Sequence, residues 1–143
     1  MIADARLMST RTPKSQNQPP ACILVVEDDI LNGFLMEETL HLAGHQVLGP
    51  AKTVPRALAL LETCAIDAAI LDLQIEDDTS LAVARRLDNL GIPWAMTTGH
   101  SRSAIPPQYA HVRVLTKPFS IAQLLNLTAD TLSDAGSRLV PAQ

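Results

Sequence analysis

The sequence predicts an α/β fold, with a doubly wound parallel sheet of five strands and helices on both faces. Short apolar runs rich in β-branched residues alternate five times with segments of helical periodicity, and such alternation implies right-handed crossovers between parallel strands. Hydrophobic residues make up 47% of the 143 residues and aromatic residues only 3%, so we expect a core of Leu, Ile, Val and Ala. A chain of this length is sufficient for one domain of ordinary size.

The first segments of the chain give two strands with a helix between them. Residues 22–26 are an apolar run typical of a strand that is buried on both faces. Residues 45–49 form a second, weaker strand that ends at Pro50. Between them, the periodicity predicts a helix over about 30–43 that stops at Gly44. Its apolar side comprises Leu31, Phe34, Leu35 and Leu42.

The next segments repeat this alternation. Apolar residues at helical spacing predict a second helix over 54–61, and residues 66–72 form the third strand. Residues 78–80 can cap a third helix that ends at Gly91. The inward-facing residues of this helix are Leu81, Ala84 and Leu87.

The last third of the domain contains two strands and a weakly supported helix before the closing one. Residues 93–97 form the fourth strand and residues 112–115 the fifth. The segment between them, 101–111, contains Pro106-Pro107, which helix interiors tolerate badly. The closing helix is marked by Ile121, Leu124, Leu125, Thr128 and Leu132.

Composition divides the chain into three parts. Residues 1–20 carry three basic side chains and one acidic side chain and end in Pro-Pro, so we expect a mobile N-terminal extension. The domain then covers residues 21–135, and residues 136–143 form a C-terminal tail. Residues 21–143 carry 8 basic and 14 acidic side chains, a formal charge of −6, whereas the whole chain carries −4. An acidic body without a basic stripe argues against nucleic acid as a direct ligand.

The expected location is the cytoplasm. The sequence has neither the continuous apolar stretch of a membrane-spanning helix nor the basic and apolar pattern of a signal peptide. Its two cysteines, Cys22 and Cys64, have no metal-binding spacing, and we interpret them as small apolar residues in a reduced protein.

Polar side chains stand where the predicted strands end. They are Glu27, Asp28 and Asp29 after the first strand, Asp72 at the end of the third, Thr98 after the fourth and Lys117 after the fifth. Because ligands of open parallel sheets bind beyond the carboxyl ends of the strands, we expect these groups to converge. Carboxylates suit Mg²⁺, and a carboxylate such as Asp72 can attack phosphorus while a metal and an ammonium group neutralise the phosphoryl oxygens.

These strand ends carry motifs that resemble the receiver domain of two-component response regulators. The matching motifs are Ile23-Leu24-Val25-Val26-Glu27-Asp28, Ile70-Leu71-Asp72-Leu73, Thr98-Gly99 and Lys117-Pro118-Phe119. Each motif is weak alone, but their order and their placement at strand ends make the resemblance strong over roughly residues 21–135. It implies a flavodoxin-like receiver fold and the role of a single-domain response regulator.

The resemblance implies a role for each site residue. Asp72 is then the phosphoacceptor, Thr98 the switch hydroxyl and Lys117 the lysine that contacts the phosphoryl group. Mg²⁺ is then held by Asp28 directly, by Glu27 through a coordinated water, by Asp72 and by the backbone carbonyl of Gln74. The peptide bond before Pro118 is then cis, a state that proline tolerates.

The sequence also departs from the family pattern. Val114 stands where the family has a switch aromatic residue, and the acidic run from Gln74 to Asp78 replaces the usual Pro and Gly. The stretch Met96–His100 is similar to a Thr-Gly-rich variant class with an irregular fourth helix. We therefore expect residues 99–111 to be a short or irregular, mobile segment that phosphorylation orders.

Simpler roles compete with site roles at several acidic and histidine residues. Capping of the first helix is favoured over metal binding for Asp29. For Glu76, Asp77 and Asp78, a solvated loop and helix cap is favoured over additional ligands, and an ordinary loop histidine is favoured for His100.

The sequence thus favours a phosphorylation-controlled signalling module that is not an enzyme. Its partners are then a histidine kinase or phosphotransfer protein and a downstream protein target, with the chain a monomer or weak dimer that binds neither nucleic acid nor membrane. Two alternatives stay open, a pseudo-receiver that binds proteins without phosphorylation and a Mg²⁺-dependent phosphohydrolase. Intact Asp72, Asp28 and Lys117 count against the first, and Gln74, where such hydrolases carry a second acid, counts against the other.

Overall fold

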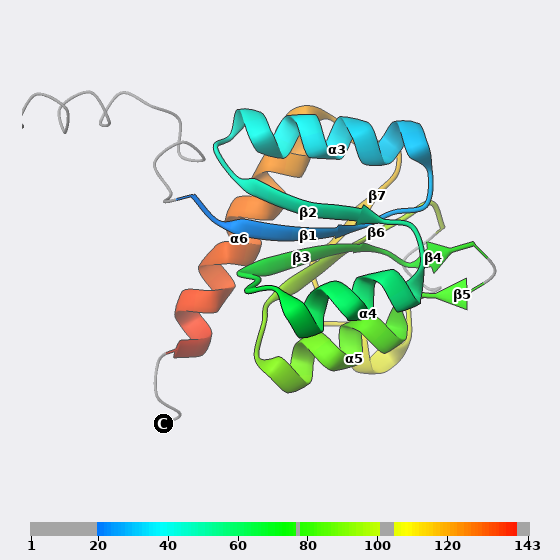
Figure 1. Ribbon diagram of the computed structural model, residues 1–143, viewed down its shortest axis with the longest axis vertical. Helices are drawn as coiled ribbons and strands as arrows, with labels where there is room; N and C mark the ends of the chain where they lie inside the picture. The colour runs from blue at the N-terminus through cyan, green and yellow to red at the C-terminus, as the bar shows by residue number, and fades with distance from the viewer. Residues whose placement is uncertain (1–19, 77, 101–104, 140–143) are drawn as a thin grey trace, which may run out of the picture.

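A parallel sheet of five strands forms the centre of the computed structural model, which describes residues 20–76, 78–100 and 105–139. Its strand order is β2-β1-β3-β6-β7, as expected for a doubly wound sheet (Figure 1). The elements are β1 (Cys22–Val26), α3 (Ile30–Leu42), β2 (Gln46–Ala51), α4 (Val54–Thr63), β3 (Ala68–Asp72), β4 (Gln74–Ile75), β5 (Asp78–Thr79), α5 (Leu81–Leu90), β6 (Trp94–Thr98), a 3₁₀ turn (Pro107–Tyr109), β7 (Val114–Thr116) and α6 (Ile121–Leu139). The predicted fold class is confirmed.

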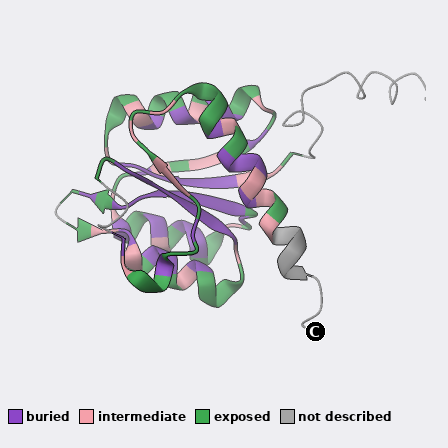
Figure 2. Cartoon of the chain, turned by 180° about the vertical axis from the view of Figure 1, so that it is seen from behind, coloured by how far each residue is buried: buried purple, intermediate pink, exposed green. Residues whose placement is uncertain are grey.

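The helices form two layers, with α3 and α6 on one face of the sheet and α4 and α5 on the other (Figure 1). Alternate residues of each central strand enter the two layers, so that Leu24 packs toward α4 and α5 while Ile23 packs toward α3 and α6. The three central strands are almost entirely buried between these layers (Figure 2). This burial on both faces explains why their sequences are continuous apolar runs.

Side chains cap three of the helices at their N-termini. The Asp29 carboxylate accepts a hydrogen bond from the Asn32 backbone at 2.7 Å, which is the capping role expected for it. Thr53 caps α4 in the same way. Ser120 and Gln123 form a reciprocal capping box at the start of α6. At the start of α5, in contrast, Ser80 makes no side-chain capping bond, so the capping expected from residues 78–80 is not made by Ser80.

The prediction of which side of α3 faces the core is wrong. Leu31, Phe34, Leu35 and Leu42 are between 52% and 79% exposed. The buried residues of α3 are instead Gly33, Met36, Thr39 and Leu40. Apolar residues occur on every side of this helix, so periodicity alone does not select the buried side. The close approach of α3 to β2 selects it, because a Cβ atom at Gly33 would lie only 3.1 Å from the Pro50 ring.

The second strand continues past its predicted end and includes Pro50. It is an edge strand, where proline removes no ladder hydrogen bond that the sheet needs. Gly49 adopts a φ of +97° there, and a Cβ atom would lie 2.7 Å from the carbonyl oxygen of Val25, so only glycine fits. The pairing of β1 with β2 shifts register beside this point.

The connection between β6 and β7 contains no α-helix in its described parts, residues 99–100 and 105–113. It forms one 3₁₀ turn at Pro107–Tyr109, as expected for a segment interrupted by two prolines. Ile105, Tyr109 and Val112 are buried and anchor it to the α4 and α5 layer. The Tyr109 ring meets the Trp94 ring edge-on, with their centroids 5.2 Å apart.

The short hairpin of β4 and β5 was not anticipated by the sequence. It lies beyond the carboxyl end of β3 (Figure 1).

Among the described residues, no helix combines the length and the apolar character needed to cross a membrane.

Candidate phosphoacceptor site

Four strand ends place polar side chains at one edge of the sheet. Glu27 directly follows β1, Asp72 ends β3, Thr98 ends β6 and Lys117 directly follows β7. In the strand register, Val26 lies beside Leu71 and Asp72 beside Thr97. Glu27 and Asp72 therefore occupy the same level on the face that α3 and α6 cover.

Three carboxylates form the acidic part of this edge. Oxygen atoms of Glu27, Asp28 and Asp72 lie within 4.8 Å of one another. Glu27 is 1% exposed and Asp72 6%, whereas Asp28 is half-buried. A hard cation with oxygen ligands, such as Mg²⁺, fits a cluster of carboxylates that are this close and open on one side to water.

The ammonium group of Lys117 bridges two of these carboxylates. Its Nζ donates to Oδ2 of Asp72 at 2.9 Å and lies 3.0 Å from Oε1 of Glu27. Burial raises the pKa of the Asp72 carboxyl to about 6, with the hydrogen bond from Lys117 acting in the opposite direction and the charge of Glu27 adding to the rise. For Lys117, burial is opposed by the hydrogen bonds to Asp72 and Glu27, and the net effect raises its pKa.

Backbone contacts tie the loop after β3 to the same cluster. Asp28 accepts a hydrogen bond from the Glu76 backbone at 2.8 Å, and Glu76 adopts a left-handed φ of 56°. Gln74, two residues beyond Asp72, lies in β4 with its side chain exposed. The side chains of Glu76 and Asp78 are also exposed, as expected for a solvated loop, and Asp77 lies outside the described residues.

Thr98 is 1% exposed and makes two contacts that link the strand ends. Its hydroxyl oxygen accepts a hydrogen bond from the backbone of His100 at 3.0 Å, and its carbonyl accepts one from the backbone of Lys117 at 2.8 Å. The side chain of His100 is exposed. The peptide bond between Lys117 and Pro118 is cis, as the resemblance implied.

Two residues of this site were missed in the sequence. Asn32 donates from Nδ2 to Oε1 of Glu27 at 2.7 Å. Its place on the first turn of a helix that follows the acidic motif is the one signal that pointed to it. Thr97 lies beside Asp72 in the register with its hydroxyl buried, and it lacks a hydrogen-bond partner among the described residues.

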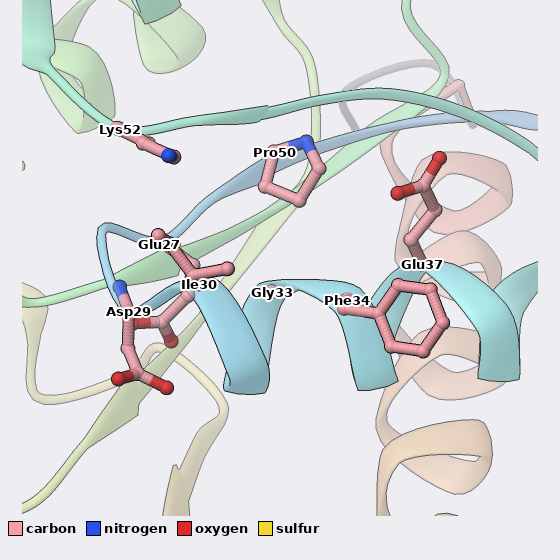
Figure 3. A pocket seen from close by; sticks show the side chains of 8 residues that line it. All are labelled: Glu27, Asp29, Ile30, Gly33, Phe34, Glu37, Pro50 and Lys52. Atoms are coloured by element: carbon pink, nitrogen blue, oxygen red, sulfur yellow. The ribbon is translucent and has the colours of Figure 1, made fainter.

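Three hollows surround the acidic edge. An open hollow of about 550 Å³ is lined by Asp29, Asn32, Leu35, Lys117, Pro118 and Phe119. A groove of about 290 Å³ continues from it between α3 and α6. On the β2 side of α3, a pocket of about 200 Å³ adjoins Glu27, with Gly33 facing Pro50 and with Phe34 and Glu37 further along the helix (Figure 3). Two of these hollows therefore touch the site, the open one at Lys117 and the small one at Glu27.

A sheet of this topology with a carboxylate cluster and a lysine at its edge defines a receiver domain. The family model of the response regulator receiver domain matches residues 23–129, and the chain belongs to that family. It is a signalling module rather than an enzyme.

Solved structures agree with this assignment. The response regulator PhyR from Brucella abortus is 26% identical with a TM-score of 0.77, and the match covers 97% of this chain but only 58% of that protein. SdrG from Sphingomonas melonis Fr1 is 32% identical with a TM-score of 0.68, over 81% of this chain and 96% of SdrG. A CheY-like receiver domain protein from Methanospirillum hungatei is 22% identical with a TM-score of 0.74, over 83% and 98%. No curated protein sequence shows a significant match to this chain.

Proposed function

We propose that Asp72 accepts a phosphoryl group from a phosphohistidine of a partner protein. A carboxylate oxygen of Asp72 forms a bond to phosphorus as the bond from phosphorus to the histidine ring nitrogen breaks, and that nitrogen keeps the electron pair. The observation that carries this proposal is the contact of 2.9 Å between Lys117 Nζ and Asp72 Oδ2 inside a cluster of carboxylates. This arrangement places a positive charge where the phosphoryl oxygens would gather negative charge.

The proposed ligands of Mg²⁺ are the residues expected from the sequence. Asp28 and Asp72 would bind the ion directly, Glu27 would act through water, and the carbonyl of Gln74 would complete the protein ligands. The ion, when bound, neutralises phosphoryl charge. The close approach of the three carboxylates supports this assignment, because without a cation their mutual repulsion raises the cost of burying them.

Thr98 and Lys117 would then respond to the new phosphoryl group. The Thr98 hydroxyl accepts from the His100 backbone, so its own proton is free to be donated to a phosphoryl oxygen. That bond would fix the start of the segment 99–111, which would turn a local charge into an altered surface. The 3₁₀ turn at Pro107–Tyr109, in place of an α-helix, and the stretch Met96–His100 support membership of the Thr-Gly-rich variant class.

The surface of α3 supports a helical partner that carries the phosphohistidine. Leu35 and Leu42 of α3 and Ile121 of α6 are exposed and line the groove, and Leu35 also lines the open hollow. The hollow is lined by Lys117 itself, so a protein seated on these apolar residues would present its histidine to Asp72. A histidine kinase or a phosphotransfer protein with an apolar helix face has the required chemistry.

The remaining expectations are part of the same proposal. The chain would act in the cytoplasm as a monomer or weak dimer, with an extension at 1–20, the domain at 21–135 and a tail at 136–143. Its signal would leave through a downstream protein target or by onward phosphotransfer, and not through nucleic acid or membrane.

Acetyl phosphate with Mg²⁺, followed by intact mass measurement, tests the proposal. We expect the mass of the wild-type protein to rise by one phosphoryl group, and Asp72→Asn to abolish the rise, because the amide is a poor nucleophile of nearly the same shape. Asp67→Asn, at an exposed position before β3, is the control and should retain the rise. An unchanged wild-type mass would favour a protein-binding module that acts without phosphorylation.

A further inference from the structure

Glu27 is a buried carboxylate that depends on three hydrogen-bond donors. Its Oε1 atom lies 3.0 Å from Nζ of Lys117 and 2.7 Å from Nδ2 of Asn32. Its Oε2 atom accepts from the backbone of Asp29 at 3.2 Å. With the side chain essentially without exposure, each of these donors replaces water that the carboxylate has lost.

Lys117 contacts two carboxylates, Glu27 and Asp72, which compete for its ammonium group. The same Nζ atom donates to Asp72 at 2.9 Å. A phosphoryl group on Asp72 brings new anionic oxygens next to this ammonium group, which then has a stronger partner than Glu27. Any withdrawal of Lys117 would leave Oε1 of buried Glu27 short of a donor, and that loss opposes phosphorylation.

We propose that Asn32 is a positioning residue that holds Glu27 when Lys117 turns to the phosphoryl group. This inference rests on the proposed function of Asp72. The amide of Asn32 makes the shortest of the three contacts to Glu27, and it comes from α3, whereas Lys117 follows β7. Because the amide is neutral, it holds the carboxylate without repelling a cation, which a second lysine would do.

The first turn of α3 gives Asn32 the rigidity that this role needs. The Asn32 backbone donates to the Asp29 side chain at 2.7 Å, so the helix cap fixes the residue whose side chain reaches Glu27. Asn32 also lines both the open hollow and the groove between α3 and α6. A partner docked there would exclude water from the Asn32–Glu27 contact and so strengthen it.

The test compares binding of beryllofluoride, a phosphoryl mimic, with binding of Mg²⁺ alone, both followed by NMR. We expect Asn32→Leu to weaken beryllofluoride binding about tenfold, the size of one hydrogen bond to a charged group. Its Mg²⁺ affinity without the mimic should fall by a smaller factor than its mimic affinity, since Lys117 still holds Glu27 in that state. Asn32→Gln keeps the amide and should restore much of the mimic affinity, and Asn89→Leu, exposed near the end of α5, is the control that should change neither.

The outcomes separate this inference from the proposed function. Wild-type protein that fails to bind the mimic in the presence of Mg²⁺ would contradict the phosphoacceptor role itself. Mimic binding that is equal in the wild type and Asn32→Leu would contradict the role of Asn32 alone. An equal loss of Mg²⁺ and mimic affinity, without rescue by Asn32→Gln, would show a general structural role and would also overturn the inference.

Discussion

Thr97 and Thr98 are adjacent and both fully buried, yet their hydroxyl groups differ in hydrogen bonding. The hydroxyl of Thr98 accepts a hydrogen bond from the His100 backbone, whereas that of Thr97 has no partner in the described part of the chain. A strand turns successive side chains to opposite faces, so Thr97 shares its face with Asp72 and Thr98 does not. The two hydroxyls therefore differ in their hydrogen bonds because of their positions at the end of β6, and not because of residue type.

This difference gives opposite expectations for two isosteric substitutions. Thr97→Val removes a buried hydroxyl that lacks a partner, so we expect the free energy of unfolding to stay equal or rise by about 1 kcal/mol. Thr98→Val leaves the His100 backbone without its acceptor and should lower the free energy of unfolding by about 1 kcal/mol. Chemical denaturation measures both. A clear destabilisation by Thr97→Val would mean that its hydroxyl is bonded in solution.

At the scale of elements, α3 carries more apolar surface than its packing needs. Met36 and Leu40 are buried against the sheet while Leu31, Phe34 and Leu35 remain exposed. A helix that is apolar on every side is ordinarily covered on every side. The exposed part of α3 therefore fits the docking surface proposed for a phosphohistidine partner, and Leu35 lines the groove there.

Substitution of Leu35 separates docking from chemistry. Leu35→Ser should change the free energy of unfolding by less than about 0.5 kcal/mol, as expected for an exposed position. It should slow phosphotransfer from a phosphohistidine protein while leaving phosphorylation by acetyl phosphate unchanged. Leu90→Ser, at an exposed leucine at the end of α5, is the matched control and should affect neither reaction. An equal loss with both donors would contradict the docking role.

The connection between β6 and β7 is the second element with a specific expectation. Its described part has one 3₁₀ turn and is anchored by Ile105, Tyr109 and Val112. Few backbone hydrogen bonds of regular structure imply a low free energy of local opening. We expect beryllofluoride with Mg²⁺ to slow amide hydrogen exchange at residues 99–100 and 105–111, because Thr98 would fix the start of the segment. Strong protection of these amides from exchange in the absence of the mimic would favour a rigid switch instead. Residues 101–104 of the predicted segment lie outside the described residues.

At the scale of the whole molecule, His45 links stability to pH. Its side chain is 5% exposed, and its Nδ1 atom accepts a hydrogen bond from the backbone of Ala21 at 3.2 Å, which requires an unprotonated Nδ1. Burial lowers the pKa of His45 below its ordinary value of 6.5, although the charge of Asp67 acts in the opposite direction. The unfolded chain therefore binds a proton more readily than the folded one does.

The sign of the pH effect follows from this difference. The contribution of His45 is fully present above its unfolded pKa of 6.5 and is lost as the pH falls toward its lower folded pKa. We expect denaturation curves to show lower stability of the wild type at about pH 5 than at about pH 8, and His45→Gln to reduce this difference. Asp72, whose pKa is raised, contributes in the opposite sense, so the comparison of the two proteins isolates His45. An unchanged pH dependence in His45→Gln would exclude His45 as its source.

Alternation of apolar runs and helical segments was enough to predict the sheet and the edge at which the site lies. Strands buried on both faces need continuous apolar sequence, and parallel strands bring their carboxyl ends to one edge, so Glu27, Asp72, Thr98 and Lys117 had to meet there. Local sequence also determined the ends at Gly44 and Gly91, which adopt positive φ, and the cap at Asp29.

Other features were decided by tertiary contacts. The buried side of α3 depends on how closely Gly33 approaches Pro50, a distance between residues that are far apart in the sequence. Lys117 spans two carboxylates because three strands set the positions of the atoms that it joins. By itself, the sequence determined which chemical groups stand at each strand end, because periodicity and turn residues are local properties. Which of those groups touch depends on distances between separate elements, and only packing in three dimensions fixes such distances.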